Sequence, residues 1–226
     1  MLNCVELETF QIEPENRRKI PAELGLSDAE FVVGMVGQIT PRKGQLEALE
    51  NFAALRARHP DATLLIAGAP MFNRDHEYLA ALKETVDRLR LEEKVKFLGL
   101  RRDVAALMQA FDVLLVNSKS EAFVVVAIEA MVCGTPVIAT DVGGTREMIE
   151  HKTNGWLVPF GDAERLQAAL IECARNPVSR RQLAEAGKAF AVSHLNAEKF
   201  IADLETFFGH ETRVKKAEGN LRMVEN

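Results

Sequence analysis

Short runs of β-branched and other apolar residues alternate along the chain with longer segments in which apolar side chains recur every three or four positions. The periodic segments predict amphipathic helices, one of them passing through Leu79, Leu82 and Val86. Strands that alternate with helices form parallel sheets covered on both faces, so the pattern predicts a doubly wound, Rossmann-like α/β domain. The predicted strands lie at 31–36, 63–67, 95–98, 113–117, 136–140 and 156–158.

The two ends of the chain differ from this alternating pattern. After residue 158 no further strand is predicted, while Asp162 and Pro177 suit the N-terminal positions of two consecutive helices. We therefore expect a domain over 31–195 that ends in extra helices, followed by a terminal helix in 196–226. The first 30 residues are rich in charge and contain two prolines, which predicts a linker and a short helix outside the core.

Composition and charge exclude several classes of protein. With 226 residues, 47% of them hydrophobic, the chain is neither disordered nor too short for a buried core. The net charge of −5, with basic pairs diluted by acids, argues against a nucleic-acid-binding face. An acidic start without a long apolar run predicts neither a signal peptide nor a membrane span. Three widely spaced cysteines indicate reduced thiols, so we expect a cytoplasmic protein.

The loop after the first predicted strand contains candidate phosphate ligands. It begins at Gly37 and Gln38 and ends in Arg42, Lys43 and Gly44, directly before a helix. Glycines permit close backbone approach and cations suit a phosphate, although an ordinary turn with solvated cations explains the pattern equally well. The spacing fits neither the dinucleotide fingerprint nor a P-loop, which argues against hydride transfer and P-loop hydrolysis.

The segment after the fourth predicted strand contains two candidate carboxylates. Glu121 precedes an apolar helix that we expect to begin near Phe123, so that free amides at 123–126 would form an anion site. Glu129 lies within that helix among apolar neighbours, where a buried carboxylate would need donors such as ribose hydroxyls. Periodicity alone favours the alternative, in which Glu129 faces solvent. After the fifth strand, Gly143 and Gly144 suit either backbone approach to a ligand or a structural tight turn.

Taken together and in this order, these loops resemble the nucleotide-sugar-binding domain of family 4 retaining glycosyltransferases, which is the C-terminal half of a GT-B fold. In that family a glycine-bounded loop ends in Lys-Gly, as Lys43 and Gly44 do here. The family segment E-x-F-G-x-x-x-x-E-A-M corresponds to residues 121–131. A Gly-Thr-Pro-Val sequence at 134–137 and the paired glycines follow, as they do in the family, and the resemblance covers about residues 3–176.

The resemblance implies a role for each of these residues. Lys43 would bind the diphosphate of a nucleotide-sugar donor, Glu121 the hydroxyls of its sugar and Glu129 those of its ribose, and we expect Lys43 and Glu121 to serve catalysis. The nucleobase would lie beside Leu100 and Arg102. No metal and no cofactor is implied, since amides and Lys43 can stabilise the departing diphosphate. The other residues assigned to the donor are Gly37, Gln38, Arg42, Ala122, Phe123, Val124, Val125, Gly143 and Gly144.

Two positions depart from the family pattern. Gln38 stands where the family usually has Arg, so one contact to the diphosphate is lost unless Arg42 replaces it. Val124 stands where the family usually has Gly, and a branched side chain there is expected to narrow the pocket or alter the preference for a sugar.

The beginning of the chain adds an expectation about its partners. The segment 3–6 resembles one that stands near the junction between the two GT-B domains, so we expect the N-terminal, acceptor-binding domain to be missing from this chain. The chain would then be a fragment or a partner-dependent half protein, with 196–226 packing against the missing half and any membrane contact peripheral and made through it. We expect the donor-binding domain of a retaining hexosyltransferase, inactive alone. The alternatives are half of a nucleotide-sugar epimerase and a non-catalytic nucleotide-binding or interaction module.

Overall fold

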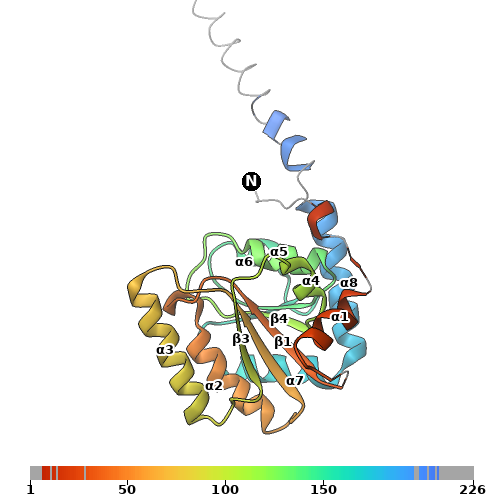
Figure 1. Cartoon of the computed structure of the whole chain (residues 1–226). Coiled ribbons are helices and arrows are strands. Elements are labelled where there is room, and N and C mark those ends of the chain that lie inside the picture. The colour runs from red at the N-terminus through yellow and green to blue at the C-terminus, as the bar shows by residue number, and fades with distance from the viewer. Residues whose placement is uncertain are drawn as a thin grey trace, which may run out of the picture.

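The computed structural model is built around a six-stranded parallel sheet in the order β3-β2-β1-β4-β5-β6 (Figure 1). It describes residues 7–10, 12–13, 15–27, 29–195, 199–202, 204–206 and 208. The six predicted strands are confirmed, each with its ends displaced by at most one residue. The strands are β1 (Phe31–Val36), β2 (Ala62–Ala67), β3 (Val95–Gly99), β4 (Val113–Val116), β5 (Val137–Thr140) and β6 (Trp156–Val158).

Helices cover both faces of the sheet, which confirms the doubly wound α/β class (Figure 1). One face carries α2, α3 and α7, the other carries α1, α4 and α5, and α8 contacts both α5 and α7. The helical elements are η1 (Leu7–Phe10), α1 (Asn16–Glu23), η2 (Pro41–Lys43), α2 (Gln45–Arg56), α3 (Asn73–Arg88), α4 (Val104–Gln109), α5 (Val125–Val132), α6 (Thr145–Met148), α7 (Ala163–Arg175) and α8 (Pro177–His194).

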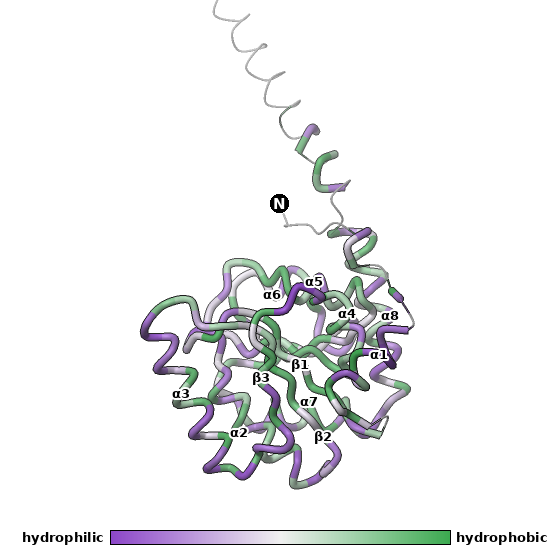
Figure 2. The backbone as a smooth tube through the Cα atoms, in the orientation of Figure 1, coloured by the Kyte–Doolittle hydropathy of each residue, from purple (hydrophilic) through white to green (hydrophobic). Residues whose placement is uncertain are grey.

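The apolar strands supply two separate layers of core. Successive side chains in a strand point to opposite faces, so Val33 of β1 packs in the layer beneath α2 while its neighbour Val32 packs beneath α4. Leu64 and Leu65 of β2 divide in the same way. Figure 2 shows the central strands largely hydrophobic, whereas α2 and α3 at the periphery alternate in hydropathy. Burial on both faces explains why the strands are continuous apolar runs.

The predicted starts of the last two helices are also confirmed. The Asp162 carboxylate accepts a hydrogen bond of 3.0 Å from the backbone amide of Arg165, which caps α7. Pro177 is the first residue of α8, and the Asn176 side chain before it accepts from the Ser179 amide at 3.0 Å. A side-chain acceptor at the cap satisfies an amide that the helix leaves without a partner, and proline at the first position has no amide to satisfy.

The expectation that the first 30 residues lie outside the core was wrong. The side chain of Ile20 in α1 is only 3% exposed, and Leu7 and Phe10 of η1 pack against the same apolar cluster. These side chains cover apolar surface of α4 and α5 that would otherwise face water. The segment 3–6 and most of the terminal helix expected in 196–226 lie outside the described residues.

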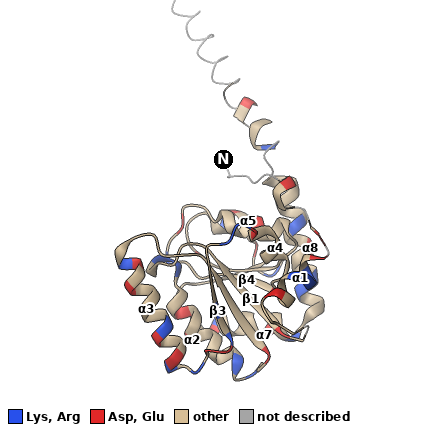
Figure 3. Cartoon of the chain, in the orientation of Figure 1, with Lys and Arg blue, Asp and Glu red and all other residues tan. Residues whose placement is uncertain are grey.

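The surface of the described residues carries both signs of charge. Along α3, for example, Lys and Arg are interspersed with Asp and Glu (Figure 3). Among the helices of the described ranges, none is both long enough and apolar enough to cross a membrane.

Candidate functional site

The strand order reverses between β1 and β4, and the two loops that follow these strands meet at this point. The chain leaves β1 toward Lys43 and leaves β4 toward Glu121. Ligands of open α/β sheets bind outside the carboxyl ends of the strands at such a reversal. A small cavity here is lined by residues of both loops, including Gly37, Lys43 and Ser118.

Lys43, Arg42 and Glu121 form a cluster of three charges, which we call the Glu121 triad. The Lys43 ammonium donates to Oε1 of Glu121 at 2.6 Å, and the Arg42 guanidinium donates to Oε2 at 2.9 Å. The Ser118 hydroxyl donates to Oε1 as well, at 2.7 Å. The side chains of Glu121 and Lys43 are 9% and 18% exposed, so these contacts are largely shielded from water.

These contacts determine the charge of Glu121. Burial raises the pKa of its carboxyl, but hydrogen bonds from Lys43 and Ser118 outweigh burial and hold that pKa below its ordinary value. Glu121 is therefore a carboxylate at neutral pH and offsets one of the two cations beside it.

A glycine brings the first loop against the second. Gly44 has φ +64°, and a Cβ there would stand 2.0 Å from the carbonyl oxygen of Asn117. The Asn117 amide in turn donates to the Gly44 carbonyl at 2.8 Å. Only a residue without a side chain permits this approach, so Gly44 serves the placement of the neighbouring Lys43.

The paired glycines after β5 bring a third loop to the same place. Gly143 has φ +53°, and a Cβ there would stand 1.6 Å from the carbonyl oxygen of Glu121. The Gly144 amide donates to the carbonyl of Ala122 at 3.2 Å. The two glycines thus form a tight turn, and the Gly144 amide, one of those expected to approach a ligand, is already engaged within the fold.

The apolar helix begins later than its sequence suggests. We expected a start near Phe123, but α5 begins at Val125, because Val124 has a non-helical backbone and Ala122 is held by the glycine turn. Residues 123 and 124 therefore precede the helix, so the expected row of free helical amides over 123–126 was wrong at its first two positions. The Val124 side chain, expected to narrow the pocket, is 2% exposed and packs in the core.

Glu129 lies in α5, apart from the Glu121 triad. It is half-buried, and its carboxylate makes no hydrogen bond or ion pair with any part of the chain that the structure describes. Burial raises the pKa of this carboxyl. A half-buried carboxylate without a partner can accept hydrogen bonds from a ligand.

Gln38 points toward α3 instead of toward the cations. Its side-chain amide donates to Oδ2 of Asp75 at 2.7 Å, and the Asp75 side chain is fully buried. Burial raises the pKa of Asp75, but hydrogen bonds from Gln38 and from the Phe72 amide hold it below its ordinary value. Sequence reasoning missed Asp75, because a single acid at the start of a helix belongs to no motif. Arg42, expected to replace the family's Arg, is bonded to Glu121.

Two further residues at the cavity escaped the sequence analysis. Ser118 stands two residues after the end of β4, where its position was itself a signal, and it is fully buried beside Glu121. Gln45 lines the cavity with a buried Oε1 that has no hydrogen-bond partner within the described residues. Arg102, by contrast, is exposed, as is Leu100, and within the described ranges no hydrogen bond or ion pair joins either residue to the Glu121 triad.

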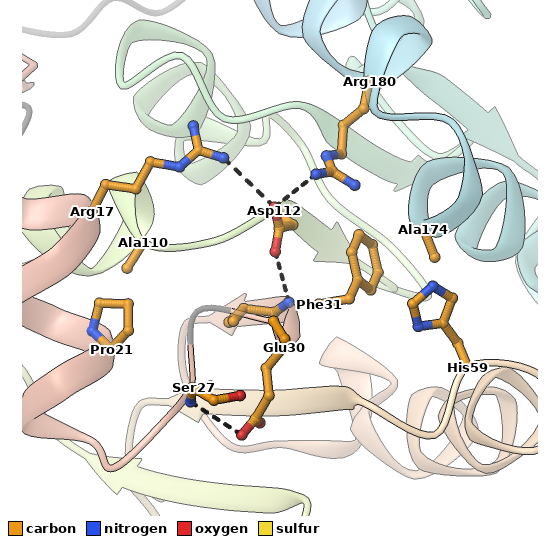
Figure 4. Close-up of a pocket in the computed structure, with 12 residues that line it drawn as sticks. Arg17, Pro21, Ser27, Glu30, Phe31, His59, Ala110, Asp112, Ala174 and Arg180 are labelled. Atoms are coloured by element: carbon orange, nitrogen blue, oxygen red, sulfur yellow. Dashed lines mark hydrogen bonds and ion pairs between the residues drawn. The ribbon is translucent and has the colours of Figure 1, made fainter.

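A second cavity lies at the opposite, amino edge of the sheet (Figure 4). There the Asp112 carboxylate accepts a hydrogen bond of 2.9 Å from the Val32 amide. It also forms ion pairs with Arg180 at 3.0 Å and with Arg17 at 3.6 Å. These contacts tie α1 and α8 to the sheet, which indicates a structural cluster. The described residues contain no group of His, Cys, Asp and Glu suited to a metal ion.

Comparison with known proteins agrees with this geometry. The family model described as "Glycosyl transferases group 1" matches residues 16–190. D-inositol 3-phosphate glycosyltransferase of Mycobacterium marinum is 36% identical over 171 residues, which are 74% of this chain and 34% of that protein. N-acetyl-alpha-D-glucosaminyl L-malate synthase of Bacillus anthracis is 28% identical over 84% of this chain and 48% of that protein.

Among solved structures, Anabaena HepE in complex with UDP and glucose superimposes with a TM-score of 0.86 and 29% identity. The match covers 92% of this chain and 55% of HepE, so the chain spans about half the length of that protein and less of the curated relatives. The shared fold and the family match lead to one conclusion: the chain belongs to the glycosyl transferases group 1 family.

Proposed function

We propose that this chain is the donor-binding domain of a retaining glycosyltransferase that takes a hexose from a nucleoside diphosphate sugar. The observation that carries the proposal is the Glu121 triad at the reversal of strand order, where two cations and a carboxylate from different loops converge. A diphosphate needs cations and a sugar needs hydrogen-bond acceptors, and this cluster offers both.

In the proposed mechanism, each group acts on a different part of the donor. Lys43 and Arg42 bind the diphosphate and stabilise the negative charge that it gains as the bond to the sugar breaks. Glu121 accepts hydrogen bonds from sugar hydroxyls and thereby orients the sugar. Glu129 accepts from the ribose hydroxyls, which would supply the partners that its carboxylate lacks within the described residues.

The relatives support this choice of ligand. HepE has been crystallised with UDP and glucose and with UDP-glucose, and it shares this fold at 29% identity. Of the two curated relatives named above, one is named a glycosyltransferase and the other an N-acetyl-alpha-D-glucosaminyl L-malate synthase, and the chain matches both over most of its own length. No observation in the described structure favours an epimerase or a non-catalytic module.

Calorimetric titration of the 226-residue chain with UDP-, GDP- and ADP-glucose tests the proposal. We expect at least one of these nucleotide sugars to bind, because Lys43, Arg42, Glu121 and Glu129 would supply the cations and carboxylates that hold it. Absence of binding for all of them, in a chain shown to be folded by circular dichroism, would refute a donor site.

Transfer to an acceptor is expected to be undetectable with this chain alone. It spans 34–55% of the relatives described above, and we propose that the acceptor is held by the part of the enzyme that lies beyond this match. Holding both reactants in register contributes about 7–11 kcal/mol to lowering the barrier. Robust transfer from radiolabelled donor to mixed sugar and lipid acceptors by this chain alone would contradict that division of roles.

A further inference from the structure

The two cations proposed to bind the diphosphate are already paired with Glu121, whose single negative charge offsets one of them. Lys43 and Arg42 each give a hydrogen bond to a different oxygen of the same carboxylate, at 2.6 and 2.9 Å. A diphosphate that enters the site must therefore compete with an anion of the protein itself. The carboxylate is 9% exposed, so water compensates little for any partner that it loses.

The free-energy cost of separating Lys43 and Arg42 from Glu121 depends on the ligand. A nucleoside diphosphate takes the cations but has no group to replace them at Glu121, which would be left with Ser118 and facing a second anion. A nucleotide sugar takes the same cations and also brings hydroxyl donors to the carboxylate. The cations then gain the diphosphate and the Glu121 carboxylate gains the sugar hydroxyls, so neither is left without a partner.

We infer that the Glu121 triad makes the site select the intact nucleotide sugar over the free nucleoside diphosphate, with Glu121 as the residue that determines this selectivity. The inference rests on the proposed function and deepens it. Once the sugar has left the donor, Glu121 loses its hydroxyl partners and competes again for Lys43 and Arg42. The same contacts thus favour release of the nucleoside diphosphate after transfer.

The test compares the dissociation constants of UDP and UDP-glucose for the parent chain and for Glu121→Gln, with GDP and ADP pairs run in parallel. Glutamine keeps an oxygen that can accept from Ser118 but carries no charge to hold the cations. Freeing one charged hydrogen bond predicts that the diphosphate alone binds about tenfold tighter. UDP-glucose should gain nothing, so the ratio of the two constants should fall by about the same factor.

Glu47→Gln is the matched control, because Glu47 is an ion-paired carboxylate near the same sheet edge, bonded to Lys119 at 3.0 Å. It removes one negative charge without touching the triad, and we expect the ratio of constants to stay within about twofold of the parent. Glu121→Asp provides a second variant should Glu121→Gln not fold, since the shorter side chain keeps its charge but reaches the cations less well. It should tighten diphosphate binding by a smaller factor.

Three outcomes separate the hypotheses. A diphosphate affinity that is unchanged or weaker in Glu121→Gln would overturn the inference, as would equal tightening of both ligands in Glu121→Gln and in Glu47→Gln. If no nucleotide sugar binds the parent chain, the proposed function itself fails. Binding to the parent with an unchanged ratio in the variants refutes the selectivity alone.

Discussion

Replacing Lys43 with alanine should weaken the binding of a nucleoside diphosphate far more than that of the corresponding nucleoside. Lys43 is the best-shielded cation of the Glu121 triad, 18% exposed against 45% for Arg42. Both ligands share the base and the ribose, whereas only the diphosphate reaches the ammonium in the proposed complex. The difference between their losses therefore isolates the contact of Lys43 with phosphate.

The size of the effect follows from the surroundings of the ammonium. A hydrogen bond to a charged group contributes about 1.5–3 kcal/mol, which corresponds to roughly a 10- to 150-fold loss of affinity. The variant also leaves the Glu121 carboxylate without its 2.6 Å partner and facing the incoming diphosphate. Repulsion from this carboxylate places the expected loss toward the upper end of that range.

Isothermal titration of the parent and Lys43→Ala with nucleoside, nucleoside diphosphate and nucleotide sugar measures this difference. Lys119→Ala is the control, since Lys119 lies near the same sheet edge but pairs with Glu47 at 3.0 Å. It changes the net charge equally and should lower diphosphate affinity only slightly. Equal losses for nucleoside and diphosphate in Lys43→Ala would refute the assignment of Lys43 to the phosphates.

Three further predictions concern the carboxylates and the glycine turn. Glu129→Ala should abolish the preference for ribonucleotides over 2′,3′-dideoxy analogues, because it removes the proposed acceptor of the ribose hydroxyls. It should not lower the melting temperature, because the half-buried charge that it removes has no partner among the described residues. Retained discrimination in the titrations would place the ribose elsewhere. Gly143→Ala should lower the free energy of unfolding by more than about 1–3 kcal/mol, because backbone strain at φ +53° adds to the clash of the new Cβ. The control Gly161→Ala, at φ +82°, has open space around it and suffers only the strain. Equal urea midpoints for the two variants would contradict this prediction. The pKa of Glu121 in the folded state lies below its ordinary value of 4.5. The ionised Glu121 should therefore stabilise the fold above pH 4.5, and this contribution should be lost as the pH falls below 4.5. On acidification the melting temperature of the parent should consequently fall more than that of Glu121→Gln.

The architecture could be predicted from the sequence because its signal is local and repeated. Strands buried on both faces must be continuously apolar, and the helices between them must be amphipathic. The predicted strand ends therefore lie within one residue of those observed. The position of Ile20 was missed for a related reason. A short helix with many charges resembles a linker until the structure shows which apolar surface it covers.

The candidate site was predictable only in part. Glycines and charges directly after strands located Lys43 and Glu121, since parallel strands carry such loops to one edge. Whether a given amide or side chain is free at that edge depends on contacts across the fold, which no spacing reveals. The engagement of Gln38 by Asp75 and the turn of Val124 into the core are both of this kind.

Glu121 contributes both to the packing of the fold, through its backbone, and to the proposed donor site, through its side chain. Its carbonyl oxygen is approached by Gly143 from the loop after β5, while its carboxylate is held by Lys43 from the loop after β1. A change in either loop therefore moves the same residue, through the backbone in one case and through charge in the other. Loss of the cation exposes an anion to the donor, whereas a side chain at Gly143 would push the backbone that carries it. Donor selectivity should consequently respond to substitutions in the glycine turn, even though the Gly144 amide donates to the carbonyl of Ala122.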